Sequence, residues 1–255
     1  MGQCFIFDKL QLMLILSYNY FMKIHVQDKT KLVNSVFTKV HKRYDFMNDV
    51  MSLGIHRLWK KNMIDWMRPQ ENSSLIDMAS GTGDIAKIFS QKTNNKSQIF
   101  CIEPNKEMMK IGSEKLKTFE NIKWVAGSAE KLPFKDGTFD YYSISFGIRN
   151  VSNINLSLKE AFRVLKVGGR FTCLEFSKIE NNILESLYKR YSKIIPYIGE
   201  YIVGSSMPYR YLVESIEQFY SQEELVKLIE KNGFSNVEFR NLSSGISAIH
   251  SGWKI

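Results

Sequence analysis

Residues that cross-link or bend a chain are scarce in this sequence, which has three cysteines and five prolines among 255 residues. Cys4, Cys101 and Cys173 form no C-x-x-C pair, which excludes a disulfide framework and favours a reducing compartment. The four histidines are scattered along the chain. Because none of them has metal-ligand spacing, we predict no metal site.

Long apolar runs are also lacking. The run over residues 10–16 is too short for a membrane span, and the first residues lack the basic start and cleavage site of a secretory signal. No arginine precedes Arg43, which argues against a transit peptide. We therefore assign no function to residues 1–29.

Acidic residues are outnumbered, with 26 Asp and Glu against 35 Lys and Arg and a formal charge of +9. This balance suits an acidic partner such as nucleic acid, anionic lipid or an acidic ligand, and it equally suits a solvated basic face. Since the sequence shows no appended RNA module, we predict no nucleic-acid partner.

A glycine turn between an apolar run and a helix is the most informative motif of the chain. Residues 75–79 read as a buried strand, Gly81 and Gly83 let the backbone approach a ligand, and a helix starts near Asp84. A helix start offers unpaired N–H groups and a partial positive charge. The next apolar run ends in Glu103, where a mononucleotide-binding half-fold holds a ribose. The pattern predicts a site for an adenosine-containing cofactor.

Strand-like and helix-like segments alternate over the rest of the chain. The predicted strands lie at residues 74–79, 98–103, 121–126, 139–146, 169–176, 235–242 and 246–254. This alternation predicts an α/β fold with a mostly parallel sheet and helices on both faces. The last two strands are joined by a short turn and must pair antiparallel. We expect one domain over residues 30–255, with residues 30–70 as a helical cover and residues 178–220 as an insertion on the substrate side.

The glycine turn is compatible with two cofactors, a dinucleotide and S-adenosylmethionine. Residues 81–86 satisfy the dinucleotide fingerprint G-x-G-x-x-G/A, but a lone match is weak and the final hairpin supplies no second nucleotide-binding half. S-adenosylmethionine needs an acid for its ribose and nearby backbone for its methionine end. Ser128 and Ala129 follow the third predicted strand, at a place where they could contact the side of an adenine ring.

The exit of the fourth predicted strand is the place for the reacting groups. Ligands of open α/β sheets bind outside the carboxyl ends of the strands, which places Ser145, Phe146, Arg149 and Asn150 beside the reacting end of the cofactor. A surface salt bridge is the alternative interpretation of Arg149.

Two long stretches carry a more specific pattern. The first reads Tyr44-Asp45-x-Met47-Asn48-x-x-x-Ser52-x-x-x-His56-x-x-Trp59, and the second, over residues 163–177, reads RVLKVGGRFTCLEFS. They resemble, in this order, the two signatures of the ubiquinone/menaquinone biosynthesis C-methyltransferases. Residues 145–150 and 245–252 are also similar to this family, and the resemblance runs from about residue 30 to the last residue.

The resemblance implies a Rossmann-like class I methyltransferase with a seven-stranded sheet. It implies S-adenosylmethionine-dependent methylation of a ring carbon of 2-methoxy-6-polyprenyl-1,4-benzoquinol, of demethylmenaquinol, or of both. The matched motifs place cofactor contacts on Thr82, Glu103, Ser128, Ala129 and Ser145, and the turn itself adds Asp77, Gly81 and Gly83. Glu103 stands where many relatives have Asp, and Ser128 where Asn or Asp is usual.

The candidate catalytic residues follow from the reaction. A ring carbon attacks a sulfonium methyl group once a ring hydroxyl has lost its proton, and the protein supplies orientation and electrostatics. Arg149 stays protonated, so it can stabilise the phenolate or position a water but cannot accept the proton. Asp45 and His56 are candidate bases, with a helix cap and a structural histidine as their alternatives. Tyr44 could close on the aromatic ring, and Asn150 accompanies Arg149.

The expected partners follow from the long apolar tail of the substrate. Residues 178–220 combine tyrosines, basic residues and isoleucines, a composition that suits a lipid interface and equally suits core packing or a dimer contact. We expect a peripheral protein on the cytoplasmic face of a bacterial inner membrane, or on the matrix face of a mitochondrial one. A homodimer and a quinone-biosynthesis complex are further expected partners.

Two other functions stay open. The same fold could methylate another small aromatic, a sterol or RNA. The chain could also be a non-catalytic scaffold of a biosynthetic assembly, although the intact glycine turn, Glu103 and Arg149 weigh against this.

Overall fold

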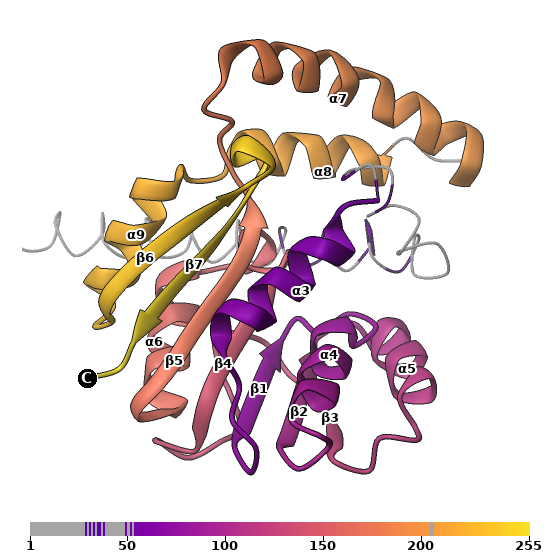
Figure 1. The fold of residues 1–255 in the computed structure, drawn as a ribbon. Coiled ribbons are helices and arrows are strands. Elements are labelled where there is room, and N and C mark those ends of the chain that lie inside the picture. The colour runs from indigo at the N-terminus through magenta and orange to yellow at the C-terminus, as the bar shows by residue number, and fades with distance from the viewer. Residues whose placement is uncertain are drawn as a thin grey trace, which may run out of the picture.

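The computed structural model describes residues 54–203 and 207–255, together with residues 29, 31, 33, 35, 36, 38, 49 and 52. Seven strands form one sheet in the order β3-β2-β1-β4-β5-β7-β6 (Figure 1). The strands are β1 (Ser74–Met78), β2 (Gln98–Glu103), β3 (Ile122–Ala126), β4 (Phe139–Ser145), β5 (Leu165–Phe176), β6 (Ser235–Leu242) and β7 (Ser247–Trp253).

The strand directions confirm the predicted mixed sheet. The neighbours from β3 to β5 pair in parallel, and β7 is antiparallel to both β5 and β6. Chain order reverses between β1 and β4, which is the switch point at which open α/β sheets bind ligands. One boundary differs from the prediction by more than a single residue. β5 begins four residues early, at Leu165, because this residue pairs with Phe139 before the register shifts.

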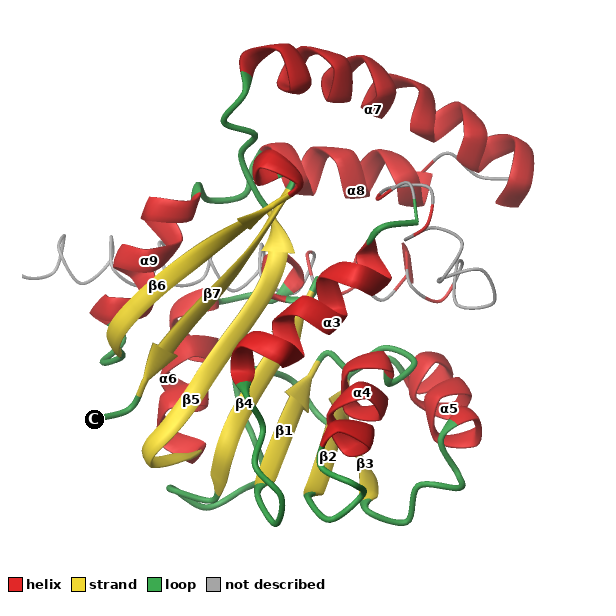
Figure 2. Ribbon diagram, in the orientation of Figure 1, coloured by secondary structure: helices red, strands yellow, loops and turns green. Residues whose placement is uncertain are grey.

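Helices cover both faces of the sheet (Figure 2). On one face α3 (His56–Met67) and α4 (Asp84–Lys92) pack on Leu75, and on the other α6 (Ile154–Val164) and α9 (Gln222–Lys231) pack on Ile76. Neighbouring residues of a strand point to opposite faces, so each apolar run of the sheet serves two cores. The short α5 (Lys106–Lys115) follows β2.

Polar side chains fix where the helices start. The Asn105 side chain accepts hydrogen bonds from the N–H groups of Glu107 and Met108, and Asn153 caps α6 in the same way. Ser221 and Glu224 form a capping box at α9. Because Asn and Ser favour N-caps, these side chains explain where the three helices begin.

Residues 178–220 form a helical pair over the carboxyl ends of β4 and β5. The long helix α7 (Asn182–Val203) lies above α8 (Met207–Glu217) in Figure 1. In the described ranges 54–203 and 207–255, no helix is long and apolar enough to cross a membrane. Within the predicted N-terminal cover the structure describes the helix α3, and most of residues 30–53 lie outside the described residues.

Candidate active site

Residues with left-handed backbone shape the turn after β1. The angle φ is 53° at Ala79, 59° at Gly81 and 84° at Gly83, the N-cap of α4. A Cβ atom at Gly83 would lie 2.5 Å from Leu116 Cδ1, so a larger residue there would displace the Leu116 side chain. The turn therefore carries bare backbone past the carboxyl end of β1 to the N–H groups that open α4.

Glu103, the last residue of β2, closes against this turn. Its Oε2 accepts a hydrogen bond from Gly81 N at 2.8 Å, and its Oε1 accepts one from Asn105 N at 2.9 Å. Burial raises the pKa of the Glu103 carboxyl to about 7, although both backbone N–H groups favour the ionised form. Each carboxylate oxygen can accept a second hydrogen bond, so the group fits the two hydroxyls of a ribose.

Asp77 is the second buried carboxyl group of this edge. Ser143 Oγ, on β4, donates a hydrogen bond to Asp77 Oδ1 at 2.7 Å. Burial raises the pKa of Asp77 to about 7 against the effect of this bond. At the end of β4, Ser145 Oγ is buried and has no hydrogen-bond partner within the described part of the chain. A bound ligand satisfies such a hydroxyl, so these residues fit a polar cofactor.

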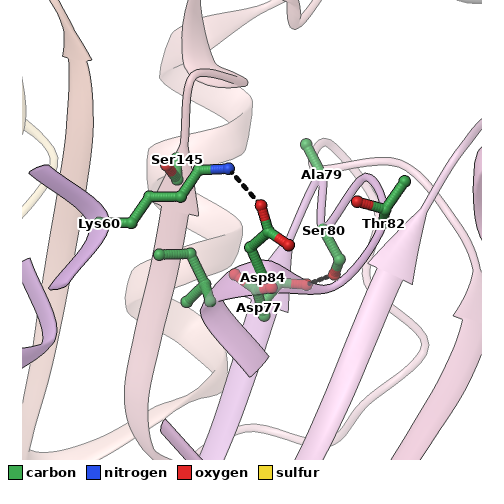
Figure 3. A pocket seen from close by; sticks show the side chains of 8 residues that line it. Lys60, Asp77, Ala79, Ser80, Thr82, Asp84 and Ser145 are labelled. Carbon is green, nitrogen blue, oxygen red and sulfur yellow. Dashed lines mark hydrogen bonds and ion pairs between the residues drawn. The ribbon is translucent and has the colours of Figure 1, made fainter. Parts of the chain in front are cut away.

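A small pocket joins the turn, the end of β4 and α3 (Figure 3). Its volume of about 10 Å³ holds roughly one water molecule. It is lined by Lys60, Asp77, Ala79, Ser80, Thr82, Asp84, Ile85 and Ser145. Thr82 Oγ1 also accepts a hydrogen bond from Lys115 Nζ at 3.3 Å. Five predicted cofactor contacts thus lie at or beside one cavity: Asp77, Thr82, Ser145 and the flanking Gly81 and Gly83.

Two lysines hold Asp84 at the mouth of this pocket. Lys60 Nζ lies 2.8 Å from Asp84 Oδ2, and Lys115 Nζ lies 2.7 Å from Asp84 Oδ1. Burial acts to raise the pKa of Asp84, but the two ammonium groups together lower it well below its usual value. Asp84 is therefore a carboxylate at neutral pH.

Ser128 and Ala129 lie just past the end of β3. The Ser128 side chain is exposed, the Ala129 side chain is buried, and Ser128 forms an isolated β-bridge with Lys131. They stand at the same edge of the sheet as Glu103, because β2 and β3 run in parallel. This placement is compatible with the predicted contact to adenine.

The exit of β4 is strained. Phe146 has φ 54°, which a bulky residue rarely adopts. Its N–H donates to Leu174 O at 2.7 Å, and its ring lies 4.9 Å from Phe176 and 6.3 Å from Trp59 between centroids. Strain of this kind costs about 1–3 kcal/mol and gathers at functional sites. The aromatic contacts hold the strand exit in this shape.

Arg149 is buried behind this exit and paired with Glu175 of β5. Its Nη1 lies 2.5 Å from Glu175 Oε1 and donates to Phe146 O at 2.9 Å. Its buried Nε has no hydrogen-bond partner among the residues described. Burial raises the pKa of Glu175, and the guanidinium opposes this. The alternative of a surface salt bridge is wrong, because both side chains are almost fully buried.

Tyrosines from the helical pair approach the same groups. Tyr211 Oη, on α8, donates to Asn150 Oδ1 at 3.0 Å, and Asn150 Nδ2 lies 3.4 Å from Phe146 O. Burial raises the pKa of Tyr188 and Tyr211, and the positive charge of Arg149 offsets only part of this rise. The predicted insertion therefore covers Arg149 and Asn150.

Of the two predicted bases, His56 is described and Asp45 lies outside the described residues, as does Tyr44, the residue expected to close on the ring. His56 Nδ1 lies 3.1 Å from Ser52 Oγ and 3.5 Å from Asp49 Oδ1. Burial, followed by the charge of Lys60, lowers the pKa of His56 to about 4. A group with this pKa accepts protons weakly at pH 7, which fits a structural histidine better than a base.

Sequence reasoning did not assign Lys60, Asp84, Glu175 and Tyr211 to the site. Lys60 follows Trp59 of the first motif, and Glu175 lies within the second, so a signal was present for both. Their pairings join distant segments, which no spacing along the chain reveals. Among the described residues there is no group of three or more His, Cys, Asp or Glu that could hold a metal ion.

Comparison with known proteins agrees with this geometry. The ubiE/COQ5 methyltransferase family matches residues 23–254. The chain is 48% identical over 242 residues to the ubiquinone/menaquinone biosynthesis C-methyltransferase UbiE of Rickettsia bellii strain RML369-C, which covers 92% of this chain and 97% of the relative. The UbiE protein of Brucella abortus strain S19 is 45% identical over 241 residues, with 92% and 90% covered.

Solved structures share the fold at low identity. A S-adenosylmethionine-dependent methyltransferase of Thermotoga maritima, described as a possible histamine N-methyltransferase, aligns with a TM-score of 0.62 and 22% identity over 87% of this chain and 99% of that chain. The [4+2]-cyclase SpnF aligns with a TM-score of 0.59 and 16% identity over 78% and 80%. Since a cyclase shares the architecture, the likeness shows the fold alone.

Proposed function

Because the chain belongs to the ubiE/COQ5 methyltransferase family and is an S-adenosylmethionine-dependent methyltransferase, we propose that it methylates a ring carbon of a polyprenylated quinol. The substrate is a benzoquinol of ubiquinone synthesis, a demethylmenaquinol, or both. S-adenosylmethionine, when bound, supplies the methyl group and the electrophilic sulfonium.

One observation of the structure carries this proposal: the exit of β4 serves two sites. Ser145 lines the small pocket beside the glycine turn, and Arg149, four residues later, is fixed by Glu175. The Arg149 Nε donor has no partner among the residues that the structure describes. A methyl donor at the pocket and a ring beside the guanidinium would meet here. Holding two reactants in line can contribute roughly 7–11 kcal/mol to catalysis.

Each cofactor-side residue contacts a different part of the methyl donor. Glu103 accepts hydrogen bonds from the ribose hydroxyls, and the turn with Gly81 and Gly83 brings backbone against the methionine end. Asp77, with its carboxyl buried beside the pocket, faces the cationic part of the donor. Thr82 and Ser145 flank the donor, and Ser128 with Ala129 borders the adenine.

The substrate-side residues lower the free energy of the phenolate that forms when the ring hydroxyl loses its proton. Arg149 Nε donates to the ring oxygen as it loses its proton, and Glu175 keeps the guanidinium in place. Asn150 and Tyr211 form a second polar pair at the same ring. A water held by Arg149 would take the hydroxyl proton, and the hydrogen on the methylated ring carbon would then leave as a proton when the ring becomes aromatic again. Tyr44 and Asp45 stay predictions as the lid and the base.

A product assay tests this proposal. The purified chain is incubated with methyl-labelled S-adenosylmethionine and a short-tail demethylmenaquinol, a short-tail methoxybenzoquinol, or total RNA. We expect label on a ring carbon of at least one quinol and none on RNA. Label on RNA alone would support the nucleic-acid alternative, and cofactor binding without any transfer would support the scaffold.

We also propose that α7 brings the protein to the membrane that holds the substrate tail. Its exposed apolar side chains lie on one helix face, at spacings of four, seven and three residues: Ile183, Leu187, Ile194 and Tyr197. A cavity of about 370 Å³ between α7, α8 and the end of β5 adjoins Tyr188, and Val213 and Ile216 line it. The tail would leave the ring through this cavity towards the apolar face.

Vesicle binding separates this proposal from core packing or a dimer contact. Leu187→Glu and Ile194→Glu should weaken binding to vesicles that contain anionic lipid. Val167→Glu is the matched control, because Val167 is an apolar residue with 79% exposure at the opposite end of β5. If the α7 variants changed sedimentation but not vesicle binding, α7 would be a dimer contact instead.

A further inference from the structure

We propose that Lys60 binds the α-carboxylate of S-adenosylmethionine, so that the helix over the pocket reads the amino-acid end of the cofactor. Lys60 directly follows Trp59, the last residue of the first motif, and the motif itself gives Lys60 no role. The inference concerns the cofactor alone and does not depend on the identity of the methyl acceptor.

The position of Lys60 carries the first part of the argument. It is the buried lysine that lines the pocket, with 6% of its surface exposed, and it projects from α3 into the space beside the glycine turn (Figure 3). An ammonium group that has left water needs an anion close by. Asp84 Oδ2, at 2.8 Å, is this anion in the structure.

Asp84 can release Lys60 without becoming an unpaired buried charge. Its other oxygen, Oδ1, pairs with Lys115 Nζ at 2.7 Å. An incoming carboxylate can therefore take Lys60 while Lys115 keeps Asp84 neutralised. The exchange conserves the number of ion pairs, which avoids the cost of an uncompensated charge.

The charges around the pocket match a free amino acid. Lys60 offers one cation, and the buried Asp77 carboxyl offers an acceptor across the same cavity. The methionine end of the cofactor carries one carboxylate and one ammonium group, and these charges are complementary to that pair. Because the pocket holds about one water, the Lys60 side chain has to move when this end enters.

Decarboxylated S-adenosylmethionine tests the assignment, since it lacks the one group that Lys60 is proposed to hold. Calorimetry without any quinol gives the dissociation constants of both compounds. A charge-assisted hydrogen bond corresponds to a factor of roughly 10–100 in affinity. The wild-type chain should prefer the complete cofactor by about this factor, and Lys60→Met should lose most of the preference by weakening the complete cofactor alone.

Two further variants separate recognition from folding. Asp84→Asn removes the same ion pair but leaves the ammonium group, so it should keep the preference. Lys60→Arg should restore it in part. If the wild-type chain bound both compounds equally, or if Lys60→Met weakened both by the same factor, the proposal would be overturned and Lys60 would be a structural link between α3 and α4.

Discussion

The cofactor side and the substrate side of this site are built in opposite ways. On the cofactor side a continuous stretch from β1 to the end of β2 supplies the turn, Asp77 and Glu103, and the pocket is nearly filled. On the substrate side Arg149, Glu175 and Tyr211 come from separate elements. A cavity of about 370 Å³, lined by other residues such as Tyr188, lies between α7, α8 and the end of β5. Local geometry thus supplies the proposed cofactor contacts, whereas tertiary packing assembles the groups that are proposed to meet the ring.

The largest expected effect is on the substrate side. Arg149→Ala should lower kcat by about 100-fold or more, because a preorganised donor to a developing oxyanion is commonly worth a factor of 10²–10³. Calorimetry should show the affinity for S-adenosylmethionine changed by less than about threefold, since Arg149 lies outside the pocket lining.

Removing Arg149 also leaves Glu175 buried without its partner, which can destabilise the fold by about 3–5 kcal/mol. The double variant Arg149→Met with Glu175→Gln removes the unpaired charge and serves as a control for folding. Unchanged turnover in a folded Arg149 variant would remove Arg149 from the chemical step.

The second effect lies on the cofactor side. Glu103→Ala should weaken S-adenosylmethionine binding by roughly 10–100-fold, because it removes a charged acceptor of two ribose hydroxyls. Glu103→Asp should weaken it less, and kcat at saturating cofactor should stay close to the wild-type value. If Glu103→Ala bound the cofactor normally, the ribose would be held elsewhere.

The third effect is a pH dependence confined to the cofactor side. Burial raises the pKa of Glu103 and of Asp77 to about 7, and the Asp77 charge contributes to the shift of Glu103. Binding needs the ionised carboxylates, so affinity should fall as the pH drops below about 7, by up to about tenfold per unit for each group. Calorimetry in buffers of different ionisation enthalpy should detect protons released on binding near pH 6.5. A flat profile between pH 6 and 8 would contradict the assignment.

The smallest effect is expected on the outer face of α7. Ile194→Glu should change turnover of a soluble short-tail quinol by less than about twofold, because exposed substitutions away from a site are usually worth under 0.5 kcal/mol. Turnover of a long-tail quinol in vesicles should fall by more. An equal loss with both substrates would place Ile194 in the catalytic site or in the folding core.

The same contrast explains what the sequence could predict. Strand order along the chain, helix starts at Asn105 and Asn153, and the turn from Asp77 to Asp84 follow from local patterns, and the structure confirms the predicted elements. The pairs Lys60–Asp84 and Arg149–Glu175 do not, because each depends on how two separated elements pack. The pKa of His56 depends on burial by several elements, so its spacing to Trp59 could not show that it is a weak base.

Ring methylation by an S-adenosylmethionine bound at this edge is the central claim, and the position of the transferred methyl group tests it most directly. Incubation with methyl-labelled S-adenosylmethionine and a short-tail demethylmenaquinol or methoxybenzoquinol, followed by NMR of the product, should place the label on a ring carbon. The label should be lost when Glu103 is replaced at limiting cofactor. Label on an oxygen, or no transfer to either quinol by a chain that binds the cofactor, would contradict the account.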